Sequence, residues 1–173
     1  WLGEMIPSAL GDGSRWGLRI SYSHEEAPPL ETGGGIHRAL PLLGESAFVV
    51  VNGDVWMNPD FRSLRLDGDD LAHLLMVPNP GHNPDGDFRL DGDRLSDVGE
   101  DRVTYSGVGV FHPQLFADCQ PGRFPLAPLL VDAMKQSRVA GTLFDGWWRD
   151  IGTAERLENL RAQLLSQTDP ATK

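Results

Sequence analysis

Two short, nearly continuous apolar runs, at residues 47–51 and 72–77, constrain the fold of this chain most strongly. Runs of this length, bounded by polar and turn-prone residues, are typical of strands that are buried on both faces of a parallel sheet. The first run is rich in β-branched residues and stops at Asn52-Gly53-Asp54. We therefore predict two strands in the interior of one sheet.

Helical and strand-like patterns alternate along the rest of the chain. Apolar spacing predicts helices over residues 1–10, 33–43, 124–135 and 153–165, the last with Thr153 as its N-cap. Alternation predicts strands over residues 18–22, 103–111 and 146–151, and a hairpin over residues 87–98 that turns at Asp91-Gly92-Asp93. Strands that alternate with helices predict an α/β fold with a mixed, mostly parallel central sheet flanked by helices.

Length and charge limit the domain organisation and the partners. The 173 residues suit one compact domain at residues 1–165, followed by a flexible tail at residues 166–173. A net charge of −10 without a basic cluster argues against a nucleic-acid partner. No apolar stretch approaches the ~18 residues that cross a bilayer, and no signal-peptide pattern opens the chain, so we expect a cytoplasmic protein without a membrane partner. Cys119 is the single cysteine, which excludes an internal disulfide. It lacks a histidine partner nearby in the sequence, so we do not expect it to act as a nucleophile.

Asp54 is the first candidate functional residue, because it follows a predicted buried strand. Ligands of open α/β sheets collect beyond the carboxyl ends of the strands. A carboxylate at that edge can bind Mg²⁺, which takes one or two protein carboxylates together with substrate phosphates. Asn52-Gly53-Asp54 would also suit a simple turn, and this segment alone leaves both interpretations open.

A glycine run, Glu31-Thr32-Gly33-Gly34-Gly35, precedes a predicted helix. Successive glycines let a ligand approach the backbone, and a helix N-terminus offers unpaired N–H donors, so a nucleotide could bind there. The run matches neither the dinucleotide-binding pattern G-x-G-x-x-G nor the Walker A motif. The alternative is a flexible loop, but three glycines carry an entropy penalty that such a loop does not require.

A third candidate is Asp150, within Trp147-Trp148-Arg149-Asp150-Ile151-Gly152-Thr153. It lies where a predicted strand meets a helix, and by itself it is explained best as a turn residue. The five histidines show no zinc-binding spacing and are interpreted as ordinary surface or core residues. No G-x-S-x-G motif supports a serine hydrolase.

Taken together and in order, three segments resemble the sugar-1-phosphate nucleotidyltransferase family: Leu30-Glu-Thr-Gly-Gly-Gly35, Val50-Val-Asn-Gly-Asp54 and Trp148-Arg-Asp-Ile-Gly-Thr153. Gly86-Asp87-Phe88 and Tyr105-Ser-Gly-Val-Gly109 extend the resemblance along the chain. The resemblance implies a Rossmann-like nucleotidyltransferase fold and the transfer of a nucleotide from a nucleoside triphosphate to a sugar 1-phosphate, releasing pyrophosphate. It is strongest to members that use UTP and N-acetylmuramate 1-phosphate in cell-wall sugar recycling.

The resemblance also implies roles for individual residues. It makes Asp54 and Asp150 the catalytic residues and the Mg²⁺ ligands. It places the nucleotide near Glu31, Thr32, Gly33, Gly34 and Asn52, and the sugar near Asp87 and Gly107.

One family feature has no counterpart here. The family opens with a strand and an arginine-bearing glycine-rich loop, followed by a Pro-Lys pair, and Trp1 aligns downstream of them. We therefore expect that this N-terminal strand and loop, and with them part of the triphosphate site, lie outside the sequence.

Other functions fit parts of the same pattern. Mannose-1-phosphate guanylyltransferases and glucose-1-phosphate thymidylyltransferases share the framework, and an inactive nucleotide- or sugar-binding module would as well. A glycosyltransferase is disfavoured because Asp54-Val55-Trp56 breaks the Asp-x-Asp metal motif. Both a monomer and a homodimer remain open.

Overall fold

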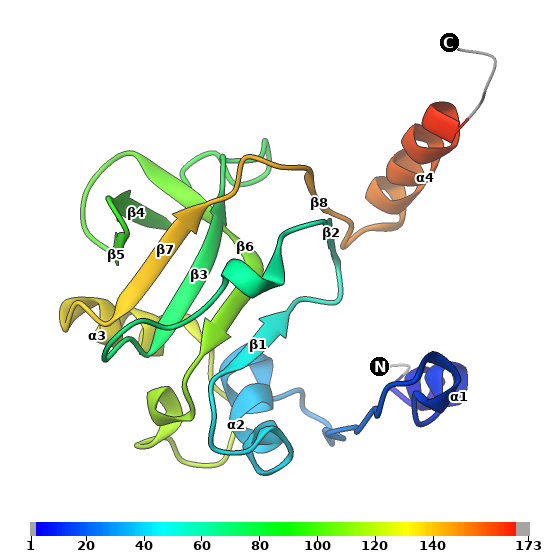
Figure 1. The fold of residues 1–173 in the computed structure, drawn as a ribbon, viewed down its shortest axis with the longest axis horizontal. Coiled ribbons are helices and arrows are strands. Elements are labelled where there is room, and N and C mark those ends of the chain that lie inside the picture. Colours follow the sequence, from blue (N-terminus) through cyan, green and yellow to red (C-terminus); the bar gives the residue numbers. More distant parts are fainter. Residues whose placement is uncertain (1–2, 169–173) are drawn as a thin grey trace.

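A computed structural model describes residues 3–168 of the chain (Figure 1). Its helices are α1 (Met5–Leu10), α2 (Glu31–Leu43), α3 (Ala127–Lys135) and α4 (Ala154–Thr168), with short 3₁₀ helices η1 (Ser14–Trp16), η2 (Phe61–Ser63) and η3 (Pro113–Phe116). Its strands are β1 (Phe48–Val51), β2 (Val55–Met57), β3 (Ala72–Val77), β4 (Phe88–Asp91), β5 (Arg94–Ser96), β6 (Arg102–Phe111), β7 (Val139–Leu143) and β8 (Trp148–Asp150). None of these helices is long and apolar enough to cross a membrane.

A six-stranded mixed sheet forms the centre, in the order β1-β6-β3-β7-β5-β4, and β4 also pairs with β6. Strands β1, β3, β4 and β7 run in one direction, and β5 and β6 run in the other. The mixed α/β fold is therefore confirmed, but the prediction that the sheet is mostly parallel was wrong for the described strands. Only β3 and β7 are parallel neighbours among the described strands, because β6 and β5 lie between strands of the common direction.

The two faces of the sheet carry two apolar clusters. The larger cluster joins alternate residues of β3, such as Leu74 and Met76, to α2 and α3, and it includes the fully buried Phe111 of β6. The smaller cluster lies around Leu75 and Val110, and apolar side chains from β2 and the segment after it cover it. Alternate side chains of a strand point to opposite faces, which explains why neighbours in β3 belong to different clusters.

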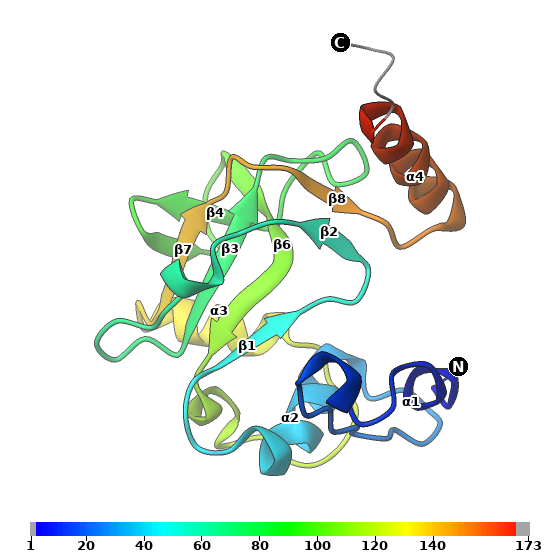
Figure 2. The same ribbon diagram turned by 45° about the vertical axis from the view of Figure 1, so that its right-hand side comes forward.

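Helices α1 and α4 lie apart from the sheet, on the same side of the molecule as the small ladder of β2 and β8 (Figures 1 and 2). This ladder is antiparallel and pairs Val55 with Asp150 and Met57 with Trp148. It brings residues 55–57, in the first third of the chain, against residues 148–150, which lie just before the last helix. The ladder is the element that positions the candidate site.

Several predicted elements are confirmed by the structure. Strand β3 has the predicted bounds, the hairpin of β4 and β5 turns at Gly92 in a left-handed conformation, and β6 matches residues 103–111 closely. Thr153 does cap α4, because its Oγ1 accepts a hydrogen bond from the backbone N–H of Arg156 at 3.2 Å.

Other predictions were wrong. Residues 18–22 form no strand, and no described strand pairs with them. Strand β1 is an edge strand of the described sheet, with Val49 44% and Val51 49% exposed, so it is not buried on both faces. The pattern of apolar residues reported a strand correctly, but its place in the sheet depends on which strands pair with it.

The ends of the chain differ from the predictions as well. Helix α1 begins only at Met5 and buries none of its residues, and Leu2 lies outside the described residues. Residues 166–168 of the predicted tail continue α4, and the remainder of that tail lies outside the described residues. Helix α3 starts at Ala127, three residues later than predicted.

Candidate functional site

Asp54 and Asp150, predicted from separate segments, lie next to each other in the structure. The β2–β8 ladder aligns them, and the backbone N–H of Ile151 donates to the Asp54 carbonyl at 2.8 Å. A Cβ atom added to Gly152 would lie 3.1 Å from a carboxylate oxygen of Asp54 and 3.1 Å from one of Asp150. Both carboxylates thus approach one small space that exists because residue 152 has no side chain.

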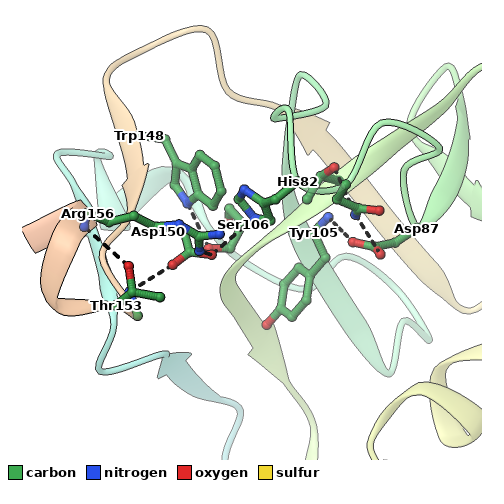
Figure 3. Close-up of polar contacts among 11 residues, drawn as sticks. His82, Asp87, Tyr105, Ser106, Trp148, Asp150, Thr153 and Arg156 are labelled. Carbon is green, nitrogen blue, oxygen red and sulfur yellow. Dashed lines mark hydrogen bonds and ion pairs between the residues drawn. The ribbon is translucent and has the colours of Figure 1, made fainter.

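Asp150 is held from three directions (Figure 3). Its Oδ1 accepts a hydrogen bond from the Gly152 N–H at 2.8 Å, and its Oδ2 accepts one from the Arg156 guanidinium at 2.8 Å. His82 Nε2 lies 3.1 Å from the same Oδ2. Burial raises the pKa of Asp150, but the Gly152 N–H, Arg156 and His82 together outweigh it and hold the pKa below its ordinary value. Asp150 is therefore ionised at neutral pH.

His82 and Arg156 were not predicted as site residues. His82 was interpreted as an ordinary surface or core residue, and in the structure its ring contacts Asp150 from a loop that is 68 residues away in the sequence. Arg156 could have been suspected, since it lies one turn into the helix that Thr153 caps. For His82 no local pattern pointed to the site.

A network of side-chain hydrogen bonds holds the His82 loop against β6. Asn83 donates to Asp87 Oδ1 at 3.0 Å and to Thr104 Oγ1 at 3.2 Å, and Thr104 in turn donates to Asn79. Asp87 Oδ2 accepts the backbone N–H of Tyr105 at 2.8 Å. The predicted sugar residue Asp87 thus has a structural role that fixes this loop, whatever else it binds.

Apart from Gly33 and Gly34, the predicted site residues divide between two neighbouring pockets. The first, of about 480 Å³, is lined by Glu31, Thr32, Asn52 and Asp87, together with apolar residues from β4 and the start of α3. The second, of about 200 Å³, is lined by Asn52, Asp54, Gly107 and Asp150. Asn52 and Tyr105 belong to both pockets, which places the two side by side.

The glycine run is not the predicted loop, because α2 already begins at Glu31. A Cβ on Gly33 would lie 2.6 Å from the Phe124 ring, and one on Gly34 would lie 2.2 Å from the Gly122 carbonyl oxygen. The Gly34 N–H donates to the Phe124 carbonyl at 3.0 Å, so this donor is not free for a ligand. These glycines therefore let α2 approach the segment that carries the pocket residues Pro125 and Leu126.

Glu31 and Gly107 have left-handed backbone conformations beside the pockets. Glu31 has φ 61°, and its carboxylate pairs with the Arg123 guanidinium at 2.7 Å. Gly107 has φ 84°, and a Cβ there would lie 2.8 Å from the Asn52 side chain. The Asn52 N–H donates to the Gly107 carbonyl at 2.8 Å, which links the two strands at the junction of the pockets.

The ligands that Asp54 and Asp150 could provide to a metal ion are carboxylate oxygens. Within residues 3–168, no group of three or more histidine, cysteine, aspartate or glutamate side chains could hold a metal ion. Two converging carboxylates suit Mg²⁺, which takes few protein ligands and completes its shell with water and phosphate. They do not suit zinc, which structural and catalytic sites hold with three or four protein ligands.

Two of the relatives that are most similar in sequence share one name. No protein-family model matches the chain. The chain is 47% identical over 171 residues to the N-acetylmuramate alpha-1-phosphate uridylyltransferase of Neisseria meningitidis, covering 94% of this chain and 74% of that protein. It is 34% identical over 148 residues to the protein of the same name from Caulobacter vibrioides, covering 78% of this chain and 61% of that one.

Solved structures agree on the fold. A putative glucose-1-phosphate thymidylyltransferase from Bacillus anthracis, solved with a sucrose, superposes with a TM-score of 0.76 at 17% sequence identity. The match covers 92% of this chain and 71% of that one.

Proposed function

This chain belongs to the sugar-1-phosphate nucleotidyltransferase family, and we propose that it joins UTP to N-acetylmuramate α-1-phosphate to give UDP-N-acetylmuramate and pyrophosphate. The observation that carries this proposal is the 47% identity to a uridylyltransferase of that specificity, across 94% of the chain. Muramate is a cell-wall sugar, so the reaction would return it to nucleotide-linked form during cell-wall recycling.

The chemistry requires few catalytic groups. A phosphate oxygen of the sugar 1-phosphate attacks the α-phosphorus of UTP. The bond between that phosphorus and the oxygen that bridges the α- and β-phosphates breaks, and pyrophosphate leaves. A phosphate monoester has a second pKa of about 6, so the attacking oxygen is already ionised at neutral pH. A general base is unnecessary, and positioning and charge neutralisation do most of the work.

Asp54 and Asp150 are the residues that would hold Mg²⁺ in this proposal. Their convergence beside Gly152 supports this role, because an oxygen-only pair of carboxylates matches the preference of that ion. When bound, Mg²⁺ would neutralise and orient the triphosphate. The chain's own part is to fix the carboxylates: Arg156 and His82 keep Asp150 ionised and aligned.

The two pockets suggest how the substrates divide. The larger pocket has the size for the nucleoside, with polar side chains at Glu31, Thr32 and Asn52 and a mostly apolar remainder. The smaller pocket, which reaches Gly107 and the two aspartates, would take the sugar end near the reacting phosphates. Asp87 lines the larger pocket instead, and it would meet a sugar hydroxyl only from that side, because an ionised carboxylate accepts more hydrogen bonds than the two that it makes.

Pyrophosphate release with three substrate pairs tests the proposal. We expect turnover with UTP and N-acetylmuramate 1-phosphate, and at least tenfold lower kcat/KM with GTP and mannose 1-phosphate or with dTTP and glucose 1-phosphate. Turnover confined to one of the latter pairs would refute the uridylyl assignment. No turnover with any pair, alongside measurable nucleotide binding, would favour an inactive binding module.

A further inference from the structure

Arg123 and Glu31 form an ion pair at the start of α2, although 92 positions separate them in the sequence. The Arg123 Nε donates to Glu31 Oε1 at 2.8 Å, and its Nη2 lies 2.7 Å from the same oxygen. Within residues 3–168, no hydrogen bond or ion pair engages the other carboxylate oxygen, Oε2. Exposed ion pairs contribute little to stability, so we expect this pair to matter little for the fold.

Glu31 has an unusual backbone conformation beside the larger pocket. Its φ of 61° lies in the left-handed region, which residues other than glycine rarely occupy. Such residues persist where the surrounding structure fixes them, and they are frequent at ligand sites. Glu31 is also one of the residues that line the larger pocket, and 37% of its side chain is exposed, so a ligand can reach that side chain.

The segment that carries Arg123 is fixed against α2 by its backbone. The Phe124 N–H donates to the Leu30 carbonyl at 3.1 Å, and the Gly34 N–H donates to the Phe124 carbonyl at 3.0 Å. These two bonds hold the residue that follows Arg123, so the guanidinium reaches Glu31 from a fixed place. Arg123 itself is not among the residues that line either pocket. We therefore expect Arg123 to act on a ligand only through Glu31.

The charge of the larger pocket gives this pair a use. Glu31 and Asp87 both line the pocket, and no arginine or lysine does. An unpaired Glu31 would repel the phosphates of a nucleotide, and Arg123 offsets that repulsion. The pair also restricts a long side chain that would otherwise sample several rotamers. An acceptor that is already ordered loses less conformational entropy when a ligand binds.

We infer that Arg123 is a positioning residue for the nucleotide: it holds the Glu31 carboxylate so that Oε2 accepts a hydrogen bond from the nucleoside. The uracil N3–H and the ribose hydroxyls are the donors that a nucleoside offers to an ionised carboxylate. The inference rests on the proposed function, because it takes the nucleotide from it. It adds Arg123, which neither the motifs nor the pocket linings identified.

The inference predicts a loss of nucleotide affinity without a loss of stability. Arg123→Gln removes the guanidinium but keeps a polar side chain, so we expect UTP to bind about threefold to tenfold more weakly. The KM for UTP should rise by a similar factor while kcat stays within about twofold. The unfolding temperature should change little, because the pair is exposed. A residue that only supports the fold would not separate these measurements.

The experiment is a double-mutant cycle on UTP binding, measured by calorimetric titration without the sugar 1-phosphate. It compares the parent with Arg123→Gln, Glu31→Gln and the combined variant, and thermal unfolding is recorded for each without ligand. If Arg123 acts through Glu31, the combined variant binds UTP no more weakly than the weaker single variant. Arg161→Gln is the matched control, because Arg161 is also 60% exposed, pairs with Glu158 at 2.6 Å and lies outside both pockets. It should bind UTP as the parent does.

Three results would overturn the inference. Unchanged UTP affinity of Arg123→Gln, where the parent binds UTP, would refute it alone. Losses that add in the combined variant would show that Arg123 does not act through Glu31. A large drop in the unfolding temperature of Arg123→Gln would assign the pair to the fold instead.

The parent protein separates a failure of this inference from a failure of the proposed function. A parent that binds GTP but not UTP would refute the proposed uridylyl specificity, and the same cycle titrated with GTP then tests Arg123. A parent that binds neither nucleotide would refute both.

Discussion

Asp150 combines contacts that a simple turn aspartate would not need. The Gly152 N–H is the contact expected of a turn, but Arg156 and His82 approach the other carboxylate oxygen from a helix and from a distant loop. A carboxylate oxygen of Asp54 also lies 3.1 Å from where a Cβ of residue 152 would be. This convergence favours a site over a turn, which the local sequence could not do.

Replacing either aspartate tests the proposed metal site. Asp54→Asn and Asp150→Asn remove a charged oxygen ligand while keeping the side-chain shape, so we expect kcat/KM to fall well over tenfold with the unfolding temperature nearly unchanged. Pyrophosphate release at saturating Mg²⁺ measures the first quantity. Asp118→Asn, at an exposed position outside both pockets, should keep the parent rate. Parent-like rates in both site variants would remove the two aspartates from the chemistry.

The reactivity of Cys119 tests the prediction that its thiol does not act as a nucleophile in the reaction. Burial and the neighbouring Asp118 raise the pKa of its thiol above the ordinary value, so less thiolate is present at pH 8 than in a free cysteine. We expect alkylation by iodoacetamide to be slower than that of free cysteine at pH 8 and to accelerate as the pH rises further. Cys119→Ala should keep pyrophosphate release within about twofold. A loss beyond tenfold without a loss of stability would contradict this.

Among the helices and strands, α2 requires glycine at residue 34 because it packs closely against the segment around Gly122. Alanine favours a helix by about 1 kcal/mol over glycine, so propensity alone predicts that Gly34→Ala stabilises the protein. The structure predicts the reverse, because the new Cβ would meet the Gly122 carbonyl at 2.2 Å. We expect a loss of about 1–3 kcal/mol in the free energy of unfolding, measured with urea.

Gly35→Ala is the matched control in the same helix. Its Cβ would meet only the Glu25 carboxylate, at 2.6 Å, and a flexible exposed side chain can move away. We expect a smaller effect than in Gly34→Ala. Equal losses at both positions would mean that the contact with the Gly122 segment does not explain the requirement for glycine.

Helix α4 depends on its cap in a similar, measurable way. Thr153→Ala removes the oxygen that accepts the Arg156 N–H, and we expect a loss of about 1 kcal/mol in the free energy of unfolding. Thr153→Ser keeps a hydroxyl and should restore most of it. An equal loss in both variants would point to the threonine methyl group instead of the cap.

At the scale of the whole molecule, β3 contributes buried residues to both apolar clusters. Leu74 is fully buried in the larger cluster, so Leu74→Ala should lower the free energy of unfolding by about 2–5 kcal/mol. Leu143, 49% exposed at the end of β7, serves as a control and should lose less than about 1 kcal/mol on the same change. Similar losses at both positions would contradict the assignment of the core.

Local patterns were enough wherever local energetics decide the structure. The strand at β3, the turn at Gly92 and the Thr153 cap were all predicted, because strand propensity, turn geometry and capping depend on residues that are close in sequence. Strand β7 was missed. It is short and contains Gly141, where a Cβ would lie 2.7 Å from Leu95, so its sequence reflects a neighbour from another strand.

The candidate site divides in the same way. The sequence by itself determined the α/β class and, through the order of its motifs, pointed to Asp54 and Asp150. Only the tertiary structure decided that these aspartates meet beside Gly152, that His82 joins them, and that the α2 glycines serve packing. The reason is physical: motifs reflect the conformation of a short segment, whereas contacts across 68 residues or more depend on which strands pair and which surfaces pack.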